Sequence, residues 1–299
     1  ILKGGIMSLS AKDRVGSRIR SILLCELIKE DPDILTDLIK LPNVIVPTNL
    51  DIIPCSRERA DELVFNKPIA KHFIEQLINY NPKIKTKSYE AFKEEIERWW
   101  LKHPDNANTP NWDIACIAEI DGSCGLVLVE AKAHKGELSR GKKSKSTGSD
   151  KSGENRTRIG EAIEVASSEL HESSKLEFNL SLDSPYQLSN RFAWSWKLAN
   201  LNIPIILVYL GFINAYEMGK DFFADHRAVE IGVKDICRES RKPSARVYIS
   251  EDVWSDNAIL TSDGIGMYSI IRSMELNIPK AEVKSINGQA MTNIRMAKA

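Results

Sequence analysis

Cysteine is scarce in this chain, and its spacing indicates neither a disulfide framework nor a metal site. The 299 residues include five cysteines, an odd and scattered set, with no Cys-x-x-Cys pair and no His/Cys cluster. Structural zinc requires such a cluster, and disulfide-stabilised folds require paired cysteines. A reduced, cytoplasmic setting therefore fits this sequence best.

The sequence also lacks a long apolar run and the common nucleotide-binding loops. Its longest apolar stretch, residues 203–213, is too short to cross a bilayer, so no membrane partner is expected. There is no Gly-Lys-Ser/Thr phosphate loop and no Gly-x-Ser-x-Gly elbow, and the glycines at 264 and 266 lack the third member of a dinucleotide fingerprint. ATPase, dehydrogenase and serine hydrolase activities therefore have no support.

Neither sign of charge predominates, because Lys+Arg and Asp+Glu are both 41. The distribution is less even, since residues 131–158 hold nine basic residues against three acidic ones. A local surplus of positive charge suits contacts with phosphate groups, and Lys142, Lys143 and Lys145 are the predicted nucleic-acid contacts. Residues 135–153 are rich in Lys, Ser and Gly and predict a loop, either a basic flap over DNA or a plain surface loop.

Two apolar segments joined by an Asp-Gly pair predict a β-hairpin, the strongest short-range signal of this kind. The first segment carries Asp113 at its head, and the second ends with Glu130 and Lys132 on one face. A two-residue loop places Asp113 opposite Glu130, and a four-residue loop over 121–124 places it opposite Lys132. Either register gathers the three charged side chains into one cluster.

Two carboxylates that face each other across a hairpin repel. Their Cβ atoms lie about 5 Å apart, and the repulsion is roughly 3 kcal/mol at an effective dielectric constant near 20. A divalent cation between them reverses the sign of the interaction, and Mg²⁺ favours one or two carboxylates together with phosphate oxygens. Lys132, on the same face, is placed to hold a water beside the metal. The cluster therefore predicts metal-assisted phosphodiester hydrolysis.

This arrangement resembles the PD-(D/E)xK, or restriction-endonuclease-like, nuclease superfamily. The matching residues are Asp113 at the head of one strand and Glu130, Ala131 and Lys132 at the end of the next, with a helix and a further strand following. The resemblance covers roughly residues 86–215, and Trp112 stands where the family pattern has Pro. It implies an α/β fold with a restriction-endonuclease-like core, in which a mixed β-sheet is flanked by helices.

The resemblance also implies roles for these residues. Asp113 and Glu130 would bind Mg²⁺ together with the backbone carbonyl of Ala131, and Mn²⁺ would substitute. Lys132 would position the attacking water and stabilise negative charge on the phosphate. The implied catalytic set is thus Asp113, Glu130 and Lys132, in a DNA-cleaving enzyme such as a restriction or defence endonuclease. Cleavage of both strands would favour a homodimer. The sequence does not separate DNA from RNA, and the alternative is a non-catalytic nucleic-acid-binding or interaction protein that keeps the fold.

A helix over residues 88–102 is predicted by a stripe of apolar residues at helical spacing. Many family members carry a further metal-associated Glu on the helix before the Asp strand. Glu95 and Glu97 flank the stripe and are the candidates for this role. Ordinary solvated surface charges are the alternative for both.

The rest of the chain predicts two regions, a helical N-terminal region over 8–85 and a nuclease-like domain over 86–299 with a basic insertion near 135–158. A further helix is predicted to end at Asn200, and three polar residues lie near its start: Gln187, Asn190 and Arg191. We interpret them as an ordinary helix start, and contacts with the DNA backbone are the alternative.

Further elements follow from the spacing of apolar residues. A helix of about sixteen residues begins near Ile159, and an apolar strand covers 205–210. In the C-terminal part we expect a strand over 245–250 and a short helix over 267–274.

Overall fold

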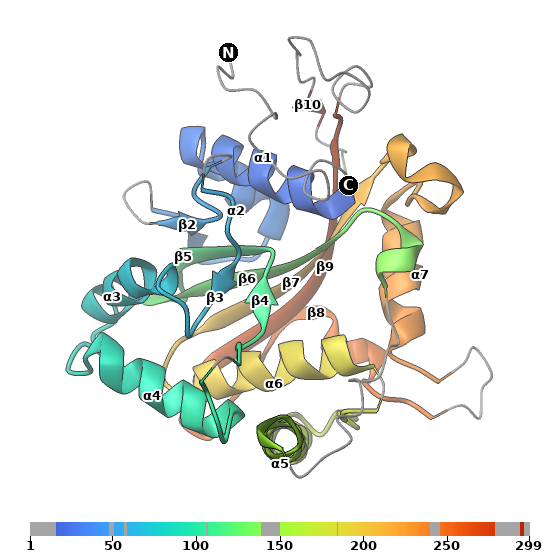
Figure 1. Ribbon diagram of the computed structural model, residues 1–299. Coiled ribbons are helices and arrows are strands. Elements are labelled where there is room, and N and C mark those ends of the chain that lie inside the picture. The colour runs from blue at the N-terminus through green and yellow to red at the C-terminus, as the bar shows by residue number, and fades with distance from the viewer. Residues whose placement is uncertain are drawn as a thin grey trace.

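The chain folds as a mixed β-sheet with helices on both faces (Figure 1). The structure is a computed structural model. It describes residues 16–47, 51–56, 59–105, 107–138, 150–183, 185–239, 246–278 and 294–295. The α/β class predicted from the sequence is confirmed, with the mixed sheet and flanking helices.

The helices are bounded as follows: α1 Gly16–Glu30, α2 Asp33–Ile39, α3 Ala70–Tyr80, α4 Tyr89–Trp100, α5 Lys151–Ser174, α6 Tyr186–Asn200 and α7 His226–Ile236, with 3₁₀ turns η3 Lys135–Glu137, η4 Tyr216–Asp221 and η5 Glu251–Val253. The strands are β1 Val44–Ile45, β2 Ile52–Ile53, β3 Leu63–Val64, β4 Asn111–Trp112, β5 Ile114–Ile120, β6 Ser123–Lys132, β7 Ile205–Ile213, β8 Ser255–Leu260, β9 Gly266–Leu276 and β10 Ile294–Arg295.

The main sheet has the strand order β1-β5-β6-β7-β9-β10, with β2 also paired to β5 and β8 to β9. β5 and β6 are antiparallel, whereas β6, β7 and β9 run parallel to one another. The crossover from β6 to β7 passes through α5 and α6, as a parallel connection requires. Every residue of β7 is buried, which is typical of a central strand covered on both faces.

Side-chain alternation along β6 divides the core into two layers. Leu126 and Leu128 pack into the cluster formed with α3 to α7, and Val127 and Val129 pack into the cluster formed with α1 and α2. Figure 1 shows α1 and α2 on one side of the sheet and α6 with α5 on the other. Glu130 and Lys132 continue the face of Leu128, so they point towards the α6 side.

The hairpin between β5 and β6 has the two-residue loop. Asp121 and Gly122 both have positive φ, 50° and 74°, as the twist-compatible turn with an Asp-Gly sequence requires. Ile120 pairs with Ser123, so the register is that of the shorter loop. The four-residue alternative, which would set Asp113 against Lys132, is wrong.

The predicted helices α4 and α6 are confirmed, and α5 is longer than its apolar pattern indicated. It begins at Lys151, where the Asp150 carboxylate accepts from the amide of Gly153 at 3.0 Å. Its buried residues start only at Ile159. The first two turns of α5 are exposed or half-buried and carry no apolar pattern. For this reason the loop predicted over 135–153 ran past Lys151, where the helix begins.

Two C-terminal predictions are wrong. Residues 267–274 belong to the parallel strand β9, not to a helix. Met267, Ile270, Ile271 and Met274 are buried at helix-like spacing because both faces of β9 are covered, which removes the alternation of a half-exposed strand. Residues 246–250, the described part of the second predicted strand, form only isolated bridges.

The N-terminal region contains the expected helices and also strands that were not predicted. Val44–Ile45 and Ile52–Ile53 pair with β5 and extend the main sheet, and Leu63–Val64 pairs with β4. Strands of two residues are too short for alternation to reveal them. β2 and β3 lie next to the head of β5, where Asp113 lies, whereas β1 pairs with the far end of β5.

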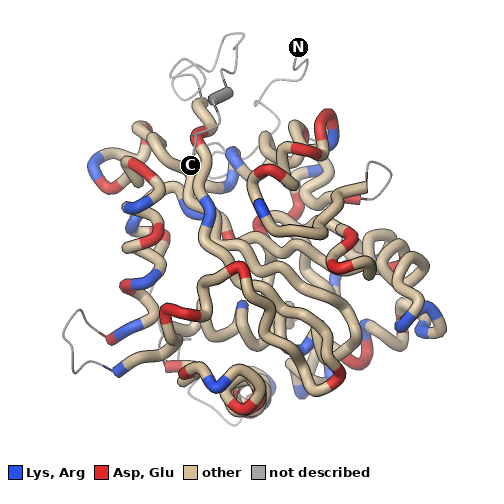
Figure 2. The backbone as a smooth tube through the Cα atoms, turned by 180° about the vertical axis from the view of Figure 1, so that it is seen from behind, with Lys and Arg blue, Asp and Glu red and all other residues tan. Residues whose placement is uncertain are grey.

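Charges of both signs are interspersed along the chain, as Figure 2 shows from behind. The basic contacts expected at Lys142, Lys143 and Lys145 lie outside the described residues. In the described part of the chain, no helix is both long and apolar enough to cross a membrane.

Candidate functional site

The hairpin brings Asp113 and Glu130 side by side. Ile114 pairs with Val129, and the next position of this register sets Asp113 opposite Glu130. Asp113 lies at the bend between β4 and β5, where its Oδ2 accepts a hydrogen bond from the amide of Ala131 at 2.8 Å. The predicted set of Asp113, Glu130, Ala131 and Lys132 therefore comes together at one point of the sheet.

Glu130 is the centre of a buried ion-pair network. The residue is only 1% exposed. Oε1 accepts from the ammonium of Lys132 and from Nε2 of Gln187 at 2.7 Å, and Oε2 accepts from Nε of Arg191 at 2.6 Å. Both carboxylate oxygens are thus held by donors from β6 and α6.

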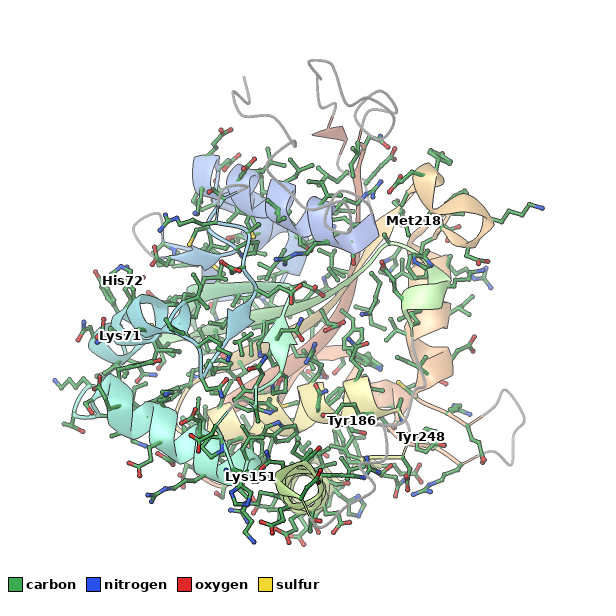
Figure 3. The ribbon with its side chains drawn as sticks, in the orientation of Figure 1. Lys71, His72, Lys151, Tyr186, Met218 and Tyr248 are labelled. Carbon is green, nitrogen blue, oxygen red and sulfur yellow. The ribbon has the colours of Figure 1, made fainter. Side chains whose placement is uncertain are left out.

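A helix does start at Tyr186, as predicted, but the prediction missed that Gln187 and Arg191 also hold Glu130 and belong to the site. Gln187 and Arg191 lie four residues apart and share one face of α6. The Arg191 guanidinium stacks over the ring of Trp112, 4.6 Å from its centroid, and Nη1 donates to Oδ1 of Asn190 at 2.8 Å. This i, i+4 pair on an otherwise buried helix is the signal that could have identified them. Tyr186 marks the start of α6 in Figure 3.

A third carboxylate, Glu62, stands on the other side of Asp113. Leu63 pairs with Trp112, and the next position of that register sets Glu62 across from Asp113. Glu62 forms an ion pair with Arg18 of α1 at 3.0 Å and accepts from the side chain of Asn111. No sequence signal pointed to Glu62, because β3 has two residues and lies some fifty positions before Asp113.

The surroundings of the two hairpin acids shift their pKa values in opposite directions. Burial, and then the negative charges of Glu130 and Glu62, raise the pKa of Asp113 to about 7, although Lys132 and the Ala131 amide act the other way. Burial would also raise the pKa of Glu130, but the charges of Arg191 and Lys132 and their hydrogen bonds outweigh it and hold that pKa below its usual value. Glu130 is therefore ionised, and Asp113 titrates near neutrality.

Both cations of the network stay charged. Burial would lower the pKa of Lys132 and of Arg191, but the negative charge of Glu130 outweighs burial and raises both above their ordinary values. Two buried cations thus oppose Glu130 and Asp113. The expected repulsion between the two acids is present, because Glu130 raises the pKa of Asp113, but Lys132 and the unpredicted Arg191 offset it.

The helix residues proposed to complete a metal site are engaged elsewhere. Glu95 pairs with Lys87 at 2.5 Å and with Lys197 at 3.6 Å, and Glu97 pairs with Lys93 at 3.7 Å. Lys197 is six residues beyond Arg191 on α6, roughly 9 Å along the helix axis. The structure therefore favours ordinary helix charges for Glu95 and Glu97.

The donor chemistry of the hairpin acids fits a hard divalent cation. Carboxylate and carbonyl oxygens suit Mg²⁺ and Mn²⁺, which complete their coordination with water and phosphate oxygens. Asp113 Oδ1 accepts no hydrogen bond from the described residues. Tyr209 of β7 lies opposite Glu130 in the strand register. The buried hydroxyl of Tyr209 has no hydrogen-bond partner among the described residues. Across the same residues, no three His, Cys, Asp or Glu side chains are grouped as metal ligands.

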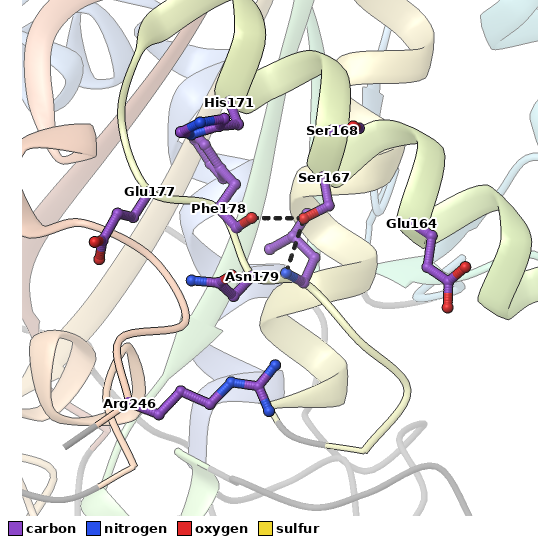
Figure 4. A pocket seen from close by; sticks show the side chains of 9 residues that line it. Glu164, Ser167, Ser168, His171, Glu177, Phe178, Asn179 and Arg246 are labelled. Carbon is purple, nitrogen blue, oxygen red and sulfur yellow. Dashed lines mark hydrogen bonds between the residues drawn. The ribbon is translucent and has the colours of Figure 1, made fainter.

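A separate cavity of about 480 Å³ lies between α5 and residues 177–180 (Figure 4). There the Ser167 hydroxyl donates to the carbonyl of Phe178 at 2.7 Å and accepts from the amide of Leu180 at 3.1 Å. The charged residues that line it are exposed, and it shares no lining residue with the acid cluster. It is therefore a surface hollow apart from Asp113 and Glu130.

Comparison of the chain with protein-family models, curated proteins and solved structures finds no match. Its function is therefore inferred from the chemistry of Asp113, Glu130 and Lys132 and of the residues around them.

Proposed function

We propose that the protein is a Mg²⁺-dependent nuclease with a restriction-endonuclease-like core that hydrolyses DNA phosphodiester bonds. The observation that carries the proposal is the cluster of half-buried Asp113 with buried Glu130 and Lys132 at the ends of neighbouring strands. The element order α4, β5–β6, α5–α6 and β7 is also the order that the nuclease superfamily requires. A restriction or defence endonuclease is one setting for such an activity.

In this proposal each side chain has a defined task. Asp113 and Glu130, with the carbonyl of Ala131, would hold Mg²⁺, which supplies Lewis acidity when bound. Lys132, kept protonated by Glu130, orients the attacking water and stabilises negative charge developing on the phosphate. Arg191 and Gln187 are positioning residues, because they fix the carboxylate of Glu130.

The second candidate function is a non-catalytic nucleic-acid-binding or interaction protein. The observation in its favour is that every oxygen of Glu130 is already engaged and that Lys132 and Arg191 balance the acids. A site of this kind is stable without a metal. Metal binding at Asp113 therefore separates the two candidates.

Metal binding should release a proton from Asp113 at mildly acidic pH. Because the pKa of Asp113 is about 7, its carboxyl is mostly neutral below that pH and must ionise to bind a cation. Affinity for Mn²⁺ or Mg²⁺ should rise up to about tenfold per pH unit below neutrality and then level off. Calorimetric titrations at pH 6 in buffers of different ionisation enthalpy would measure close to one proton released. Binding without proton release, or equal binding by Asp113→Asn, would contradict the assignment.

A cleavage assay tests the proposed activity itself. Purified protein is incubated with plasmid, linear and single-stranded DNA, and with RNA, in Mg²⁺, in Mn²⁺ and in EDTA. The nuclease proposal requires products that depend on the metal. Binding without any cleavage under these conditions supports the second candidate.

A further inference from the structure

A cavity of about 540 Å³ adjoins the acid cluster and shares Glu62 with it. It is lined by Arg18 of α1 and by residues in and around β3, which are Asp61, Glu62, Val64, Lys67, Pro68 and Ile69. Its volume lies within the range of about 300–1,000 Å³ that small-molecule sites occupy. Because Glu62 stands across from Asp113, whatever fills this cavity lies next to the proposed hydrolytic site.

Lys67 is a cation of this cavity whose ammonium has no partner among the described residues. The side chain is half-buried, and no hydrogen bond or ion pair joins its ammonium to a described residue. Its backbone amide donates to the carbonyl of Val64 at 2.9 Å, so the chain turns there and Lys67 stays beside β3. Arg18, the other cation of the cavity, is occupied by Glu62 and by the carbonyl of Ala60. A half-buried ammonium such as that of Lys67 suits an anionic ligand.

The rest of the lining restricts which anion fits. Val64 and Ile69 are half-buried and give the cavity an apolar wall beside Lys67. Asp61 and Glu62 lie on the same lining, so a phosphate is favoured only at Lys67, away from these two carboxylates. A ligand with one phosphate and an apolar or aromatic body matches these features, and a nucleotide is such a ligand. A base that is stacked and paired within a duplex cannot enter a pocket without first leaving the stack.

We infer that this cavity, the Lys67 pocket, binds one unpaired nucleotide of the substrate strand beside the scissile phosphate. The phosphate of that nucleotide lies on Lys67, and its sugar or base packs against Val64 and Ile69. This inference rests on the proposed nuclease function and adds a substrate class to it. The preferred substrates are single strands, flaps and frayed ends, in contrast to the interior of a fully paired duplex.

Charge reversal at Lys67 tests the pocket, with Lys71→Glu as the matched control. Lys71 lies on α3, is 54% exposed, pairs with Glu75 and Glu90, and does not line the pocket (Figure 3). Binding is measured in Ca²⁺ by fluorescence anisotropy with a labelled single-stranded oligonucleotide and with relaxed, covalently closed circular duplex as competitor. Lys67→Glu should weaken single-strand binding about tenfold, and Lys67→Ala should flatten the salt dependence by about 0.7 in log–log slope. The Kd of circular duplex, obtained from the competition curves with each variant's own probe affinity, should be the same for all variants.

Four other outcomes would contradict the Lys67 pocket or the nuclease proposal. Equal binding by Lys67→Glu and Lys71→Glu overturns the pocket, whatever the cleavage assay gives. Equal loss for single strand and circular duplex makes Lys67 a general phosphate contact and also overturns it. Displacement of the oligonucleotide by nucleoside 5′-monophosphates at equal concentration assigns the pocket to free nucleotides and overturns the strand assignment. A selective Lys67 effect in a protein that never cleaves leaves the pocket intact and removes the nuclease proposal.

Discussion

In EDTA, the Glu130→Gln variant should melt roughly 10 °C below the wild-type protein. A glutamine carries no charge, and its amide hydrogens would face the donors of Arg191, Lys132 and Gln187 that Glu130 now satisfies. Arg191 and Lys132 are 3% and 7% exposed, so both would remain as buried cations without their carboxylate. Removal of one partner from a buried ion pair typically destabilises a protein by about 3–5 kcal/mol.

Asp113→Asn is the matched control and should shift stability in the opposite direction. The pKa of Asp113 is raised from 3.8 to about 7, so the neutral carboxyl is the form that the fold favours. The stability that this preference contributes is complete below pH 3.8 and is lost as pH rises from there through about 7. Asparagine stays neutral and still offers an oxygen to the amide of Ala131. The variant should therefore match the wild type at low pH and melt higher at pH 8.

Thermal melts of both variants, recorded at several pH values in EDTA, measure these shifts. The pKa of Glu130 is lowered, so its contribution is present at neutral pH and is lost as the carboxyl is protonated in acid. Adding Arg191→Met to Glu130→Gln should recover part of the loss, because one of the stranded cations is removed. A Glu130→Gln protein as stable as the wild type would show that this network is incidental to the fold.

A large kinetic effect is expected at Lys132. Its ammonium acts chiefly on charge that develops in the transition state, so Lys132→Ala should reduce turnover by a factor of about 100 or more. Binding of substrate in Ca²⁺ should change little, because ground-state affinity does not depend on that interaction. Glu130 keeps its contacts with Gln187 and Arg191 in this variant, so the site stays ordered.

Single-turnover cleavage and binding isotherms for Lys132→Ala separate a catalytic group from a phosphate contact. Lys135→Ala, which changes an exposed lysine three positions along, should leave both quantities unchanged. If Lys132→Ala lost affinity and rate in equal proportion, Lys132 would be a simple phosphate contact.

The hairpin half of the site was predictable because its determinants are local. The Asp-Gly turn fixes the register of β5 on β6, and the register alone carries Asp113 to Glu130. Strand alternation then adds Lys132 to the same face. The sequence left two loop lengths open, but both gather these three residues, so their clustering was predictable and only the structure selects the register.

The other half depends on contacts that sequence patterns do not encode. Gln187 and Arg191 reach Glu130 only after a crossover of more than fifty residues, and Glu62 reaches Asp113 through a two-residue strand. The counter-charges that stabilise the acids were therefore missed. In β9, burial on both faces gives the apolar residues a helix-like spacing, and the segment is a strand because it pairs with β7.

Cleavage of DNA by the wild type and by Asp113→Asn, each in Mg²⁺, Mn²⁺ and EDTA, tests the central proposal most directly. The wild type should produce cleaved single-stranded or plasmid DNA with either metal and none in EDTA. Asp113→Asn, folded and at least as stable in EDTA, should be slower by a factor of about 100 or more because the metal loses a ligand. Asp113→Asn cleaving as fast as the wild type, or a wild type that binds but never cleaves, would contradict the proposal.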